Sequence, residues 1–465
     1  MESQEQSERE ICHVIVLGRD RTEVLLKPAE TGFVFPTLEI PRRVRLAENL
    51  TTALRKDWGC DAVCLFTPNH SSEDGKSNGE HYEVMECWQD EGRKSETVWR
   101  AIHSLTADSF QNEGGFRIFE QCLHQLDRYE CDPSSPFARR GWLGSLRDWT
   151  ADVIRPFGLE LTGAMRQYNA GPSFCLIRFE TVGSAVWFKA VGKPNLRELP
   201  ITLELARRFP GFIPEILGTR PEWNGWVSRE VNGTNLGETR DTTLWELAAT
   251  GLARLQIESI SEAQSILQSG AHDLGAKHLL TAVDPFFDFV ARLMEQQLKV
   301  PPAILNRDEL SLLKLRIADT LILLEDLRIP DALGHLDLNP CNVIVSANTC
   351  VFIDWAEAYA GPPFFSFEYF LEHFRREIGA NFVFESRLVQ AYRAAWTRLF
   401  SDEVVREVLA LAPLAAVFAY AAGIEAWEDE ESLRDPKIAG YFRSLARKMN
   451  REAIQLIERR SLCLG

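Results

Sequence analysis

The sequence predicts an α+β protein in which a β-rich start and a small mixed lobe precede a large helical lobe. One observation is the length of 465 residues, which suggests two or three domains. Another is the composition, because 45% hydrophobic and 25% charged residues exclude a disordered, collagen-like or coiled-coil chain. The third is the order of hydrophobic patterns: strand-like segments recur between helical ones up to residue 231, and nearly all of the chain from residue 244 onward has helical spacing.

Charge and cysteine content narrow the classes of partner and compartment. The 67 acidic and 51 basic residues give a formal net charge of −16, which disfavours a nucleic-acid partner and an anionic membrane surface. The ten cysteines have no zinc-type spacing, and the first ten residues are polar and acidic, unlike a signal peptide. The apolar run 408–424 is shorter than a bilayer span and contains Pro413, so we expect a buried core helix. We therefore expect a cytoplasmic protein without a membrane partner, and the oligomeric state stays open.

Residues 1–135 predict a small α/β domain. A linker-like stretch at 131–141, with two prolines, a glycine and two serines, sets the boundary near residue 135. The expected elements are a hairpin of strands 11–18 and 23–27, a helix at 48–58, strands at 62–66 and 81–88 on either side of a loop at 70–78, and a helix at about 115–128.

Two further segments follow, a mixed lobe at 136–232 and a helical lobe at 233–465. In the mixed lobe we expect helices at 143–155 and 199–209 and strands at 174–179, 185–190 and 225–231. Pro200 falls in the first turn of its helix, where the missing N–H costs nothing. In the helical lobe, a loop and two short strands interrupt the helices around 333–356.

The string His335-Leu-Asp337-Leu-Asn-Pro-Cys-Asn342, followed by Val351-Phe-Ile-Asp354, has the layout that phosphoryl transfer needs. Asp337 can accept the proton of an attacking hydroxyl, while Asn342 and Asp354 can offer oxygens to a magnesium ion that bridges the phosphates. A tight hairpin between Asn342 and Asp354 would bring these groups together. The alternative is structural: Asp337 and Asn342 form turns, and Asp354 caps a helix.

Residues 333–345 and 352–358 resemble the aminoglycoside phosphotransferase / choline kinase group of protein-kinase-like small-molecule kinases, which read H-G-D-x-x-x-x-N and then I-D-x. Over about 145–430, this resemblance implies a two-lobed protein-kinase-like fold with ATP and Mg²⁺ as cofactors. It implies that Asp337 is the catalytic base, that Asn342 and Asp354 bind the metal, and that His335 is a structural loop residue. The sequence departs from the pattern at Leu336, where the family has glycine, and at 361–367, which lacks two later acids.

Weaker resemblances lie upstream. Lys189 resembles the strand lysine that contacts nucleotide phosphates, although a lysine lying along surface apolar groups fits as well. Glu198 resembles the helix glutamate that pairs with this lysine, and Glu204 is a competitor for that role.

Two segments resemble other parts of a nucleotide site. Glu230 and Gly233 fit the spacing of a hinge whose backbone meets adenine, and they equally fit a plain strand-to-turn junction. Residues 169–174 occupy the place of the nucleotide loop but are poor in glycine.

The first part of the chain resembles a Nudix hydrolase core in its order of strands and helix. Such an enzyme needs a helix with the pattern R-E-x-x-E-E, so that several glutamates face one metal ion. Here the helix carries Glu48 alone among glutamates and has basic residues where acids belong, so it cannot form that metal cage. The resemblance therefore implies a Nudix-like domain that is catalytically inactive.

Taken together, the sequence predicts a small-molecule kinase that transfers the γ-phosphoryl group of ATP to a hydroxyl. A pseudokinase-type binding or scaffold protein is one alternative, and a Nudix-type hydrolase with a degenerate C-terminal partner is another. The acceptor is not readable from the sequence. The acidic residues Glu425 and 428–431 suit a cationic substrate such as an aminoglycoside, but a solvated acidic helix end explains them better.

Overall fold

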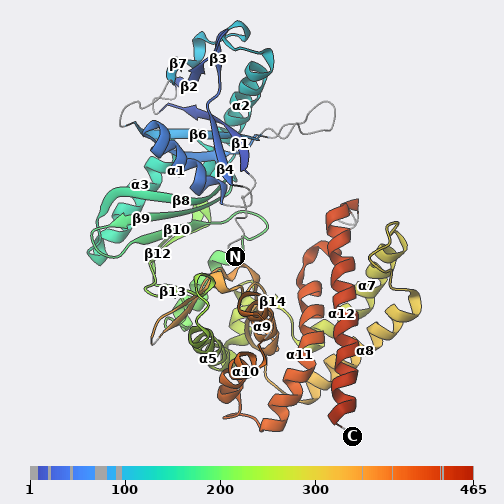
Figure 1. The fold of residues 1–465 in the computed structure, drawn as a ribbon. Coiled ribbons are helices and arrows are strands. Elements are labelled where there is room, and N and C mark those ends of the chain that lie inside the picture. The colour runs from blue at the N-terminus through green and yellow to red at the C-terminus, as the bar shows by residue number, and fades with distance from the viewer. Residues whose placement is uncertain are drawn as a thin grey trace, which may run out of the picture. The chain divides into compact units, whose positions relative to one another are not determined.

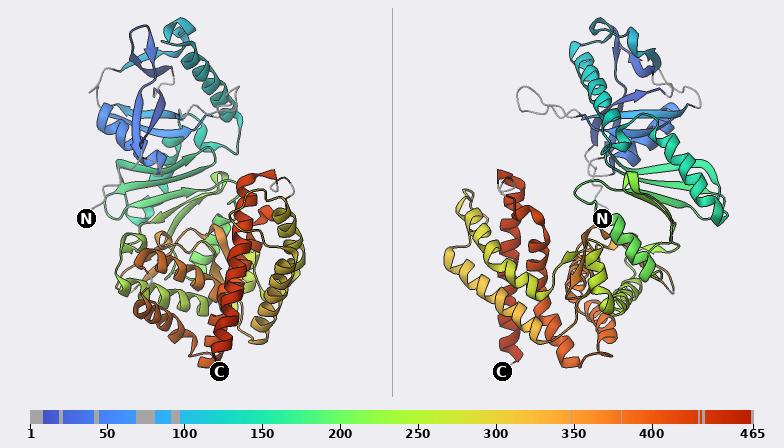
Figure 2. Two further views of the ribbon diagram at one scale, coloured as in Figure 1. Left: turned by 45° about the vertical axis from the view of Figure 1, so that its right-hand side comes forward. Right: turned by 180° about the vertical axis from the view of Figure 1, so that it is seen from behind.

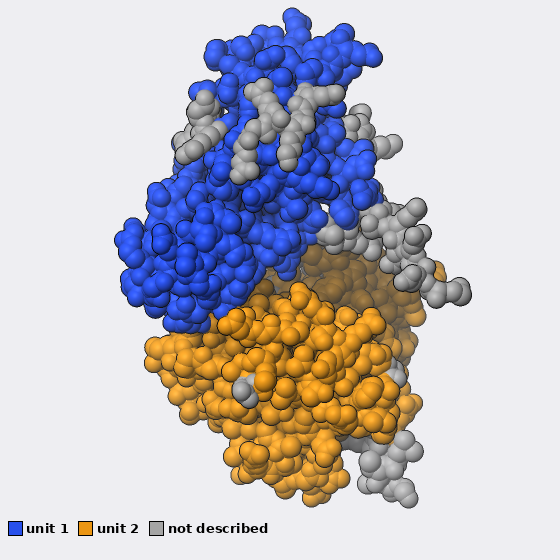
Figure 3. Space-filling model, turned by 60° about the vertical axis from the view of Figure 1, so that its left-hand side comes forward, with its two compact units in different colours: residues 1–199, 215–230 blue, residues 200–214, 231–465 orange. Residues whose placement is uncertain are grey.

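The computed structural model describes residues 9–18, 22–41, 45–68, 81–90, 97–347, 349–379, 381–429, 431 and 434–463, so the loop predicted at 70–78 lies outside the described residues. The chain forms two compact units (Figure 3). Unit 1 contains residues 1–199 and 215–230, and unit 2 contains residues 200–214 and 231–465. Each unit has its own hydrophobic core.

Within the described residues, the first sheet of unit 1 has seven strands in the order β3-β2-β1-β6-β5, with β4 beside β1 and β7 beside β2. β1 and β6 are parallel, and the hairpin of β1 and β2 confirms the pairing predicted from the sequence. The strands are β1 (Arg9–Leu17), β2 (Glu23–Pro28), β3 (Phe33–Val34), β4 (Thr37–Pro41), β5 (Cys60–Phe66), β6 (His81–Asp90) and β7 (Val98–Ala101).

Helices α1 (Leu46–Trp58) and α2 (Glu113–Cys131) pack on this sheet (Figure 1) and confirm two predicted helices. Successive side chains of a strand point to opposite faces of a sheet. In β1, Val14 packs in a core with α1, whereas Ile15 packs in a different core with α2. Both faces of the sheet are therefore buried, which explains why β1 reads as a continuous hydrophobic run.

The second sheet of unit 1 is antiparallel, in the order β11-β12-β10-β9-β8. One face, which includes Phe179, Phe188 and Val227, is buried in a core with helix α3, and the opposite face carries Lys189. The elements are α3 (Trp142–Ile154), β8 (Leu161–Gly171), β9 (Phe174–Thr181), β10 (Val186–Ala190), β11 (Ile216–Arg220) and β12 (Gly225–Arg229).

Strand β8 joins the two sheets of unit 1 through one polar side chain. The buried Gln167 accepts a hydrogen bond from the N–H of Cys64 at 2.8 Å and donates to the Cys64 carbonyl at 3.3 Å. Cys64 lies on β5, the edge strand of the first sheet. Gln167 thus satisfies backbone groups that an edge strand would otherwise leave unpaired. The hydrophobic core that holds Ile15 also continues into α3 and the second sheet.

Unit 2 is mostly helical and has two three-stranded sheets among its described residues, β13-β16-β17 and β14-β18-β15. The strands are β13 (Thr234–Asn235), β14 (His272–Asp273), β15 (Ala332–His335), β16 (Val343–Val345), β17 (Cys350–Phe352) and β18 (Ala358–Gly361). The helices are α4 (Glu198–Arg208), which starts in unit 1, α5 (Thr242–Ser259), α6 (Ala263–Gln268), α7 (Ala276–Glu295), α8 (Arg307–Asp326), α9 (Phe364–Ile378), α10 (Phe382–Trp396), α11 (Asp402–Gly423) and α12 (Pro436–Cys463).

Helix α11 is the one helix of the described residues that is long and apolar enough to cross a membrane by length and composition. Its side chains Leu411, Leu414 and Phe418 are nonetheless buried in the core of unit 2, which confirms the core helix predicted over 408–424. Figure 2 shows α12 beside α7 and α8 in both views. The guanidinium of Arg443 on α12 donates to the carbonyl of Leu293 on α7 at 2.8 Å.

The α+β class predicted from the sequence is confirmed, with a sheet-rich N-terminal part and a helical C-terminal part. Strand β8 is the main element that the sequence does not predict. Of its eleven residues, only Gln167 and Gly171 are buried, so it lacks the alternating apolar pattern of a half-buried strand. The domain boundaries near residues 135 and 232 stay predictions.

Candidate active site

The loop between β15 and β16 holds Asp337 in a defined orientation. Its Oδ1 atom accepts hydrogen bonds from Nδ2 of Asn339 at 3.1 Å and from the hydroxyl of Tyr369 at 3.4 Å. Its Oδ2 atom lies 3.4 Å from Nδ2 of Asn342. The carboxylate is half-buried, so it is both fixed and accessible. These features suit a group that accepts a proton from a bound hydroxyl.

Asn342 and Asp354 are brought together by the hairpin of β16 and β17, as the sequence predicts. Val343 pairs with Phe352, and the N–H of Ile353 donates to the carbonyl of Asn342 at 3.0 Å. Asp354 follows directly, in the left-handed conformation (φ 68°, ψ 60°) that residues other than glycine seldom adopt. A strained residue at the end of a strand is a common feature of functional sites.

The donor set of these two residues suits a hard divalent cation. Because Nδ2 of Asn342 faces Asp337, donating to its carbonyl at 3.0 Å, the amide oxygen of Asn342 is the atom that a cation would contact. Asp354 is exposed and supplies a carboxylate. Carboxylate and amide oxygens are typical ligands of Mg²⁺, which keeps several waters and binds few protein groups. The residues therefore fit the magnesium ion that the sequence predicts.

His335 connects the loop of Asp337 to the strand that leads to Asp354. It is fully buried, and burial lowers the pKa of its imidazole below the usual value, which favours the neutral form. Its Nδ1 atom accepts the N–H of Asp337 at 3.1 Å, so Nε2 carries the proton and donates to the carbonyl of Ile353 at 3.1 Å. Both ring nitrogens are thus used internally, which agrees with the structural role that the family resemblance implies.

Ser366 and Tyr359 hold this loop through hydrogen bonds. The hydroxyl of Ser366 accepts the N–H of His335 at 2.8 Å and lies 3.0 Å from the hydroxyl of Tyr359. The ring of Tyr359 needs a glycine beside it, because a Cβ on Gly334 would lie 1.8 Å from a ring carbon. Residues 361–367 lack the two acids of the family pattern, and here Ser366 and Tyr359 hold the loop instead.

The departure at Leu336 has a structural explanation. Its backbone N–H donates to the carbonyl of Glu357 at 2.9 Å, and φ is not in the positive range. Its side chain is 5% exposed and packs towards Gly423, where an added Cβ would lie 3.2 Å from a methyl group of Leu336. The loop therefore forms without glycine at this position.

In unit 1, Lys189 and Glu198 form the predicted ion pair. The ammonium of Lys189 lies 2.5 Å from Oε1 of Glu198, whose side chain is 1% exposed. Lys189 also lies 5.8 Å from the ring centroid of Trp226. The competitor Glu204 binds Arg207 at 2.8 Å and Arg208 instead, and these hydrogen bonds lower its pKa to about 2. The prediction that Lys189 shares a cleft with the Asp337 loop in unit 2 stays a prediction.

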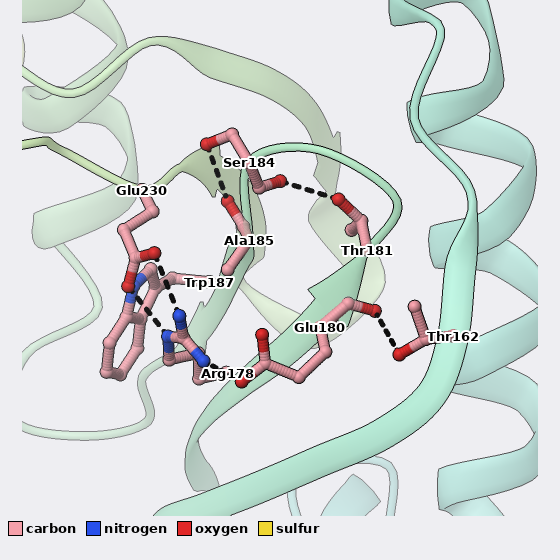
Figure 4. A network of polar contacts seen from close by, with 8 residues as sticks. All are labelled: Thr162, Arg178, Glu180, Thr181, Ser184, Ala185, Trp187 and Glu230. Carbon is pink, nitrogen blue, oxygen red and sulfur yellow. Dashed lines mark hydrogen bonds and ion pairs between the residues drawn. The ribbon is translucent and has the colours of Figure 1, made fainter.

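Glu230 is held by side chains of the second sheet (Figure 4). The guanidinium of Arg178 makes two hydrogen bonds to its carboxylate at 2.7 and 2.9 Å, and the indole of Trp187 donates to it at 3.3 Å. Arg178 is the main reason that the pKa of Glu230 is below its usual value. The N–H of Glu230 donates to the carbonyl of Ala185 at 2.9 Å. Contact between adenine and the backbone of the segment that holds Glu230 and Gly233 stays a prediction.

The segment proposed as a nucleotide loop is a tight turn between β8 and β9. β8 ends at Gly171 and β9 begins at Phe174, which leaves Pro172 and Ser173 in the turn. The carbonyl of Pro172 accepts the N–H of Phe137 at 3.1 Å. The structure thus ties this turn to the start of the mixed lobe, and its contact with a nucleotide stays a prediction.

Helix α1, for which the sequence suggests a resemblance to a Nudix helix, contacts β8 through its glutamate. Glu48 pairs with Arg166 of β8 at 2.6 Å. Among the residues that the structure describes, no group of three or more His, Cys, Asp or Glu side chains is placed to hold a metal ion. The absence of a hydrolase metal cage in α1 stays a prediction.

Sequence reasoning missed three residues of the site, Asn339, Tyr369 and Ser366. Asn339 precedes a proline in the loop, and its Oδ1 accepts the N–H of Cys341 at 3.0 Å, so an Asx turn was a readable signal. Tyr369 and Ser366 lie on α9, about thirty residues after the loop, where no motif marks them.

Parts of the chain are similar to known proteins. Residues 232–403 match the model of the phosphotransferase enzyme family. No curated protein matches the chain. Among solved structures, an ethanolamine kinase of Plasmodium vivax aligns at 12% identity and a TM-score of 0.47, covering 72% of this chain and 93% of that one. A type I macrolide 2′-phosphotransferase aligns at 17% identity and a TM-score of 0.41, covering 63% and 96%. A choline kinase of Cryptosporidium parvum aligns at 12% identity and a TM-score of 0.42, covering 68% and 96%.

The family match spans the Asp337 loop, the hairpin that ends at Asp354, and helix α9. It therefore coincides with the cluster whose geometry suits phosphoryl transfer. Residues 232–403 of the chain are thus similar to the phosphotransferase enzyme family.

Proposed function

We propose that this protein is an ATP- and Mg²⁺-dependent kinase that phosphorylates a hydroxyl group of a small molecule. The observation that carries the proposal is the arrangement around His335, which joins the loop of Asp337 to the strand end of Asp354 through two hydrogen bonds of 3.1 Å. The two segments that His335 joins thus carry a proton acceptor and two oxygen ligands for a cation. The ion pair of Lys189 and Glu198 supports a phosphate contact in unit 1.

The proposed reaction transfers one phosphoryl group and one proton. The acceptor oxygen forms a bond to the γ-phosphorus while the bond from that phosphorus to the β–γ bridging oxygen breaks, and ADP leaves. Asp337 accepts the hydroxyl proton through its carboxylate. Asn339 and Tyr369 hold this carboxylate, so it does not have to reorient during the reaction.

The residues proposed to bind the nucleotide have separate roles. Mg²⁺, when bound, would neutralise phosphate charge, and Asn342 and Asp354 are the residues that would hold it. Lys189 would contact the phosphates, and Glu198 would keep its ammonium in place.

The N-terminal domain serves binding or packing in this proposal, not hydrolysis, because α1 carries one glutamate, Glu48, and that glutamate pairs with Arg166. We also place the protein in the cytoplasm, without a nucleic-acid or membrane partner. Nine described cysteines are free thiols, which suits a reducing compartment.

Nucleotide binding by the purified protein tests this proposal. We expect ATP to bind in the presence of Mg²⁺, with slow release of ADP in the absence of an acceptor. The variant Asp354→Ala should lose the Mg²⁺-dependent part of binding, whereas Asp326→Ala, which removes an exposed carboxylate at the end of α8, should bind as the parent does. Binding of Mg²⁺-ATP without any turnover on hydroxylated metabolites would favour the alternative of a pseudokinase-type scaffold.

A further inference from the structure

Residues 233–238 pack against the turn that carries Asn342. The turn is a short 3₁₀ helix, Pro340–Asn342, and leads directly into β16. Within residues 233–238, strand β13 pairs antiparallel with β16, so that Asn235 lies opposite Ile344. This backbone pairing holds the segment beside β16, but it does not reach the turn that precedes the strand.

The side chain of Asn235 holds the turn itself. Its Nδ2 atom donates a hydrogen bond to the carbonyl of Cys341 at 2.8 Å, and its Oδ1 atom accepts the N–H of Gly237 at 2.9 Å. The second bond caps the short 3₁₀ helix Leu236–Glu238. Because the two ends of the amide have different partners, the amide cannot rotate without losing a hydrogen bond.

The carbonyl that Asn235 binds belongs to the peptide bond between Cys341 and Asn342. The N–H of the same peptide bond donates to the carbonyl of Asn339 at 2.9 Å. A peptide bond is planar, so a hydrogen bond at each of its polar groups fixes the orientation of the whole plane. One of these bonds is local, and the other comes from Asn235, 106 positions earlier in the chain.

Close packing adds a second constraint on the turn. A Cβ on Gly237 would lie 2.6 Å from Sγ of Cys341, so a larger residue would have to displace that side chain. A Cβ on Gly233 would lie 2.8 Å from the carbonyl oxygen of Val345. The segment therefore touches both the turn and the end of β16.

The orientation of this peptide matters because Asn342 offers a neutral oxygen to the cation. A neutral amide attracts a cation less than a carboxylate does, and Mg²⁺ needs near-octahedral geometry with ligands at about 2.0–2.1 Å. Nδ2 of Asn342 donates to the carbonyl of Asp337 at 3.0 Å, which orients the side chain. The backbone that carries this side chain is oriented by Asn235 and Asn339.

We propose that Asn235 is a positioning residue for the proposed magnesium ligand Asn342. It does not touch the cation, and it acts by fixing the peptide plane from which Asn342 extends. This inference rests on the proposed kinase function and adds a residue to the same site. Without the amide of Asn235, the peptide plane can rotate, so Mg²⁺ should bind less tightly.

The test measures ATP binding to the full chain by isothermal titration over a range of Mg²⁺ concentrations. The variant Asn235→Ser keeps a hydroxyl that can accept the N–H of Gly237, but serine is too short to reach the carbonyl of Cys341. We expect the Mg²⁺ concentration for half-maximal ATP binding to rise about fivefold, since one hydrogen bond contributes roughly 0.5–1.5 kcal/mol. Turnover at saturating Mg²⁺ should stay within about twofold of the parent.

Asn306→Ser is the matched control. Asn306 caps α8 in a capping box with Glu309, and serine preserves that arrangement, so the Mg²⁺ requirement should equal that of the parent. An unchanged requirement in Asn235→Ser, with or without a lower Tm, would overturn the inference, as would an equal rise in both variants. Absence of Mg²⁺-dependent ATP binding in the parent would contradict the proposed kinase function itself, and the inference with it.

A steric variant tests the same contact while the amide of Asn235 remains. Gly237→Ala places a methyl group against Sγ of Cys341 and should displace the turn, which should raise the Mg²⁺ requirement about fivefold. In the double variant Gly237→Ala/Cys341→Ala the sulfur is absent, so the requirement should return to within about twofold of the parent. No rise in the single variant, or no recovery in the double variant, would contradict the inference.

Discussion

At the scale of single residues, the buried carboxylate of Glu198 holds the ammonium of Lys189 on the face of the second sheet opposite Phe188. The substitution Glu198→Gln keeps the shape of the side chain and removes the charge. We expect the Kd for Mg²⁺-ATP to rise about tenfold, because a hydrogen bond between charged groups contributes roughly 1.5–3 kcal/mol. Isothermal titration of the purified variant measures this change.

The matched control is Glu204→Gln on the same helix, α4. This glutamate pairs with Arg207 and Arg208, so its loss should leave nucleotide affinity within about twofold of the parent. Equal weakening by both variants would mean that the Lys189–Glu198 pair has no special part in nucleotide binding.

The site residues that could be predicted from the sequence share one property: a motif fixes their spacing along the chain. Asp337, Asn342 and Asp354 stand at set distances along the chain, and the hairpin between them is local. Tyr369 contacts Asp337 from a helix that starts at Phe364, and no local pattern connects the two. Glu198 and Glu204 lie on one helix, and only the structure decides which of them faces Lys189.

At the scale of elements, the contact between β8 and β5 depends on one buried amide. Gln167→Leu would leave the N–H and the carbonyl of Cys64 without their partner in a buried place. Each unsatisfied backbone group costs roughly 1–3 kcal/mol, so for the two groups we expect a loss of stability of about 2–6 kcal/mol. Urea denaturation of the full chain measures it.

The neighbouring residue provides the control for this variant. Arg166 pairs with Glu48 at 2.6 Å, but its side chain is 54% exposed, so Arg166→Gln should cost less than about 1 kcal/mol. A Gln167→Leu protein as stable as the Arg166→Gln protein would show that Gln167 does not hold the two sheets together.

The first sheet also contains a buried carboxyl group that makes stability depend on pH. Glu83 on β6 is 3% exposed and accepts a hydrogen bond from Thr67 at 2.7 Å, and burial raises the pKa of its carboxyl to about 7. The unfolded chain releases this proton near its ordinary value of 4.5, whereas the folded chain keeps it up to about pH 7. This stabilisation is therefore complete below pH 4.5 and is lost as the pH rises to about 7, by about 3 kcal/mol in all.

Comparison of Glu83→Gln with the parent isolates this effect. Between pH 5 and pH 8 the parent should lose more stability in urea than the variant, since glutamine does not titrate. A difference between the two proteins that stays constant from pH 5 to pH 8 would contradict the raised pKa.

Most helices and the hairpin of β1 and β2 were predictable because their hydrophobic spacing or turn residues are local signals. β8 was not, because its pattern is polar and its stabilising contact, Gln167 with Cys64, joins residues 103 positions apart. Such an element becomes recognisable only when its partner strand is known.

At the scale of the whole molecule, the N-terminal domain and the second sheet share one hydrophobic core within unit 1. This core contains Ile15, Phe119, Trp142 and Phe188. A chain that starts at residue 136 would expose the second half of this core to water. We expect the truncated chain to aggregate or to unfold well below the Tm of the full protein.

Light scattering and thermal unfolding of the two proteins measure this prediction. Addition of a separate polypeptide of residues 1–135 should partly restore solubility, because it covers the exposed face. A truncated chain that is monomeric and unfolds at the Tm of the full protein would mean that residues 1–135 form an independent domain.

The central claim is that Asp337 accepts the proton of the acceptor hydroxyl while Asp354 holds the metal-bound nucleotide. The most direct measurement compares turnover and Mg²⁺-ATP affinity for Asp337→Ala, Asp354→Ala, Asn342→Ala and the control Cys341→Ala in one buffer. We predict that Asp337→Ala binds nucleotide as the parent does and turns over at least about 100-fold more slowly. Asp354→Ala should lose affinity, Asn342→Ala should need more Mg²⁺, and Cys341→Ala should match the parent. Turnover of Asp337→Ala at the parental rate would contradict the account.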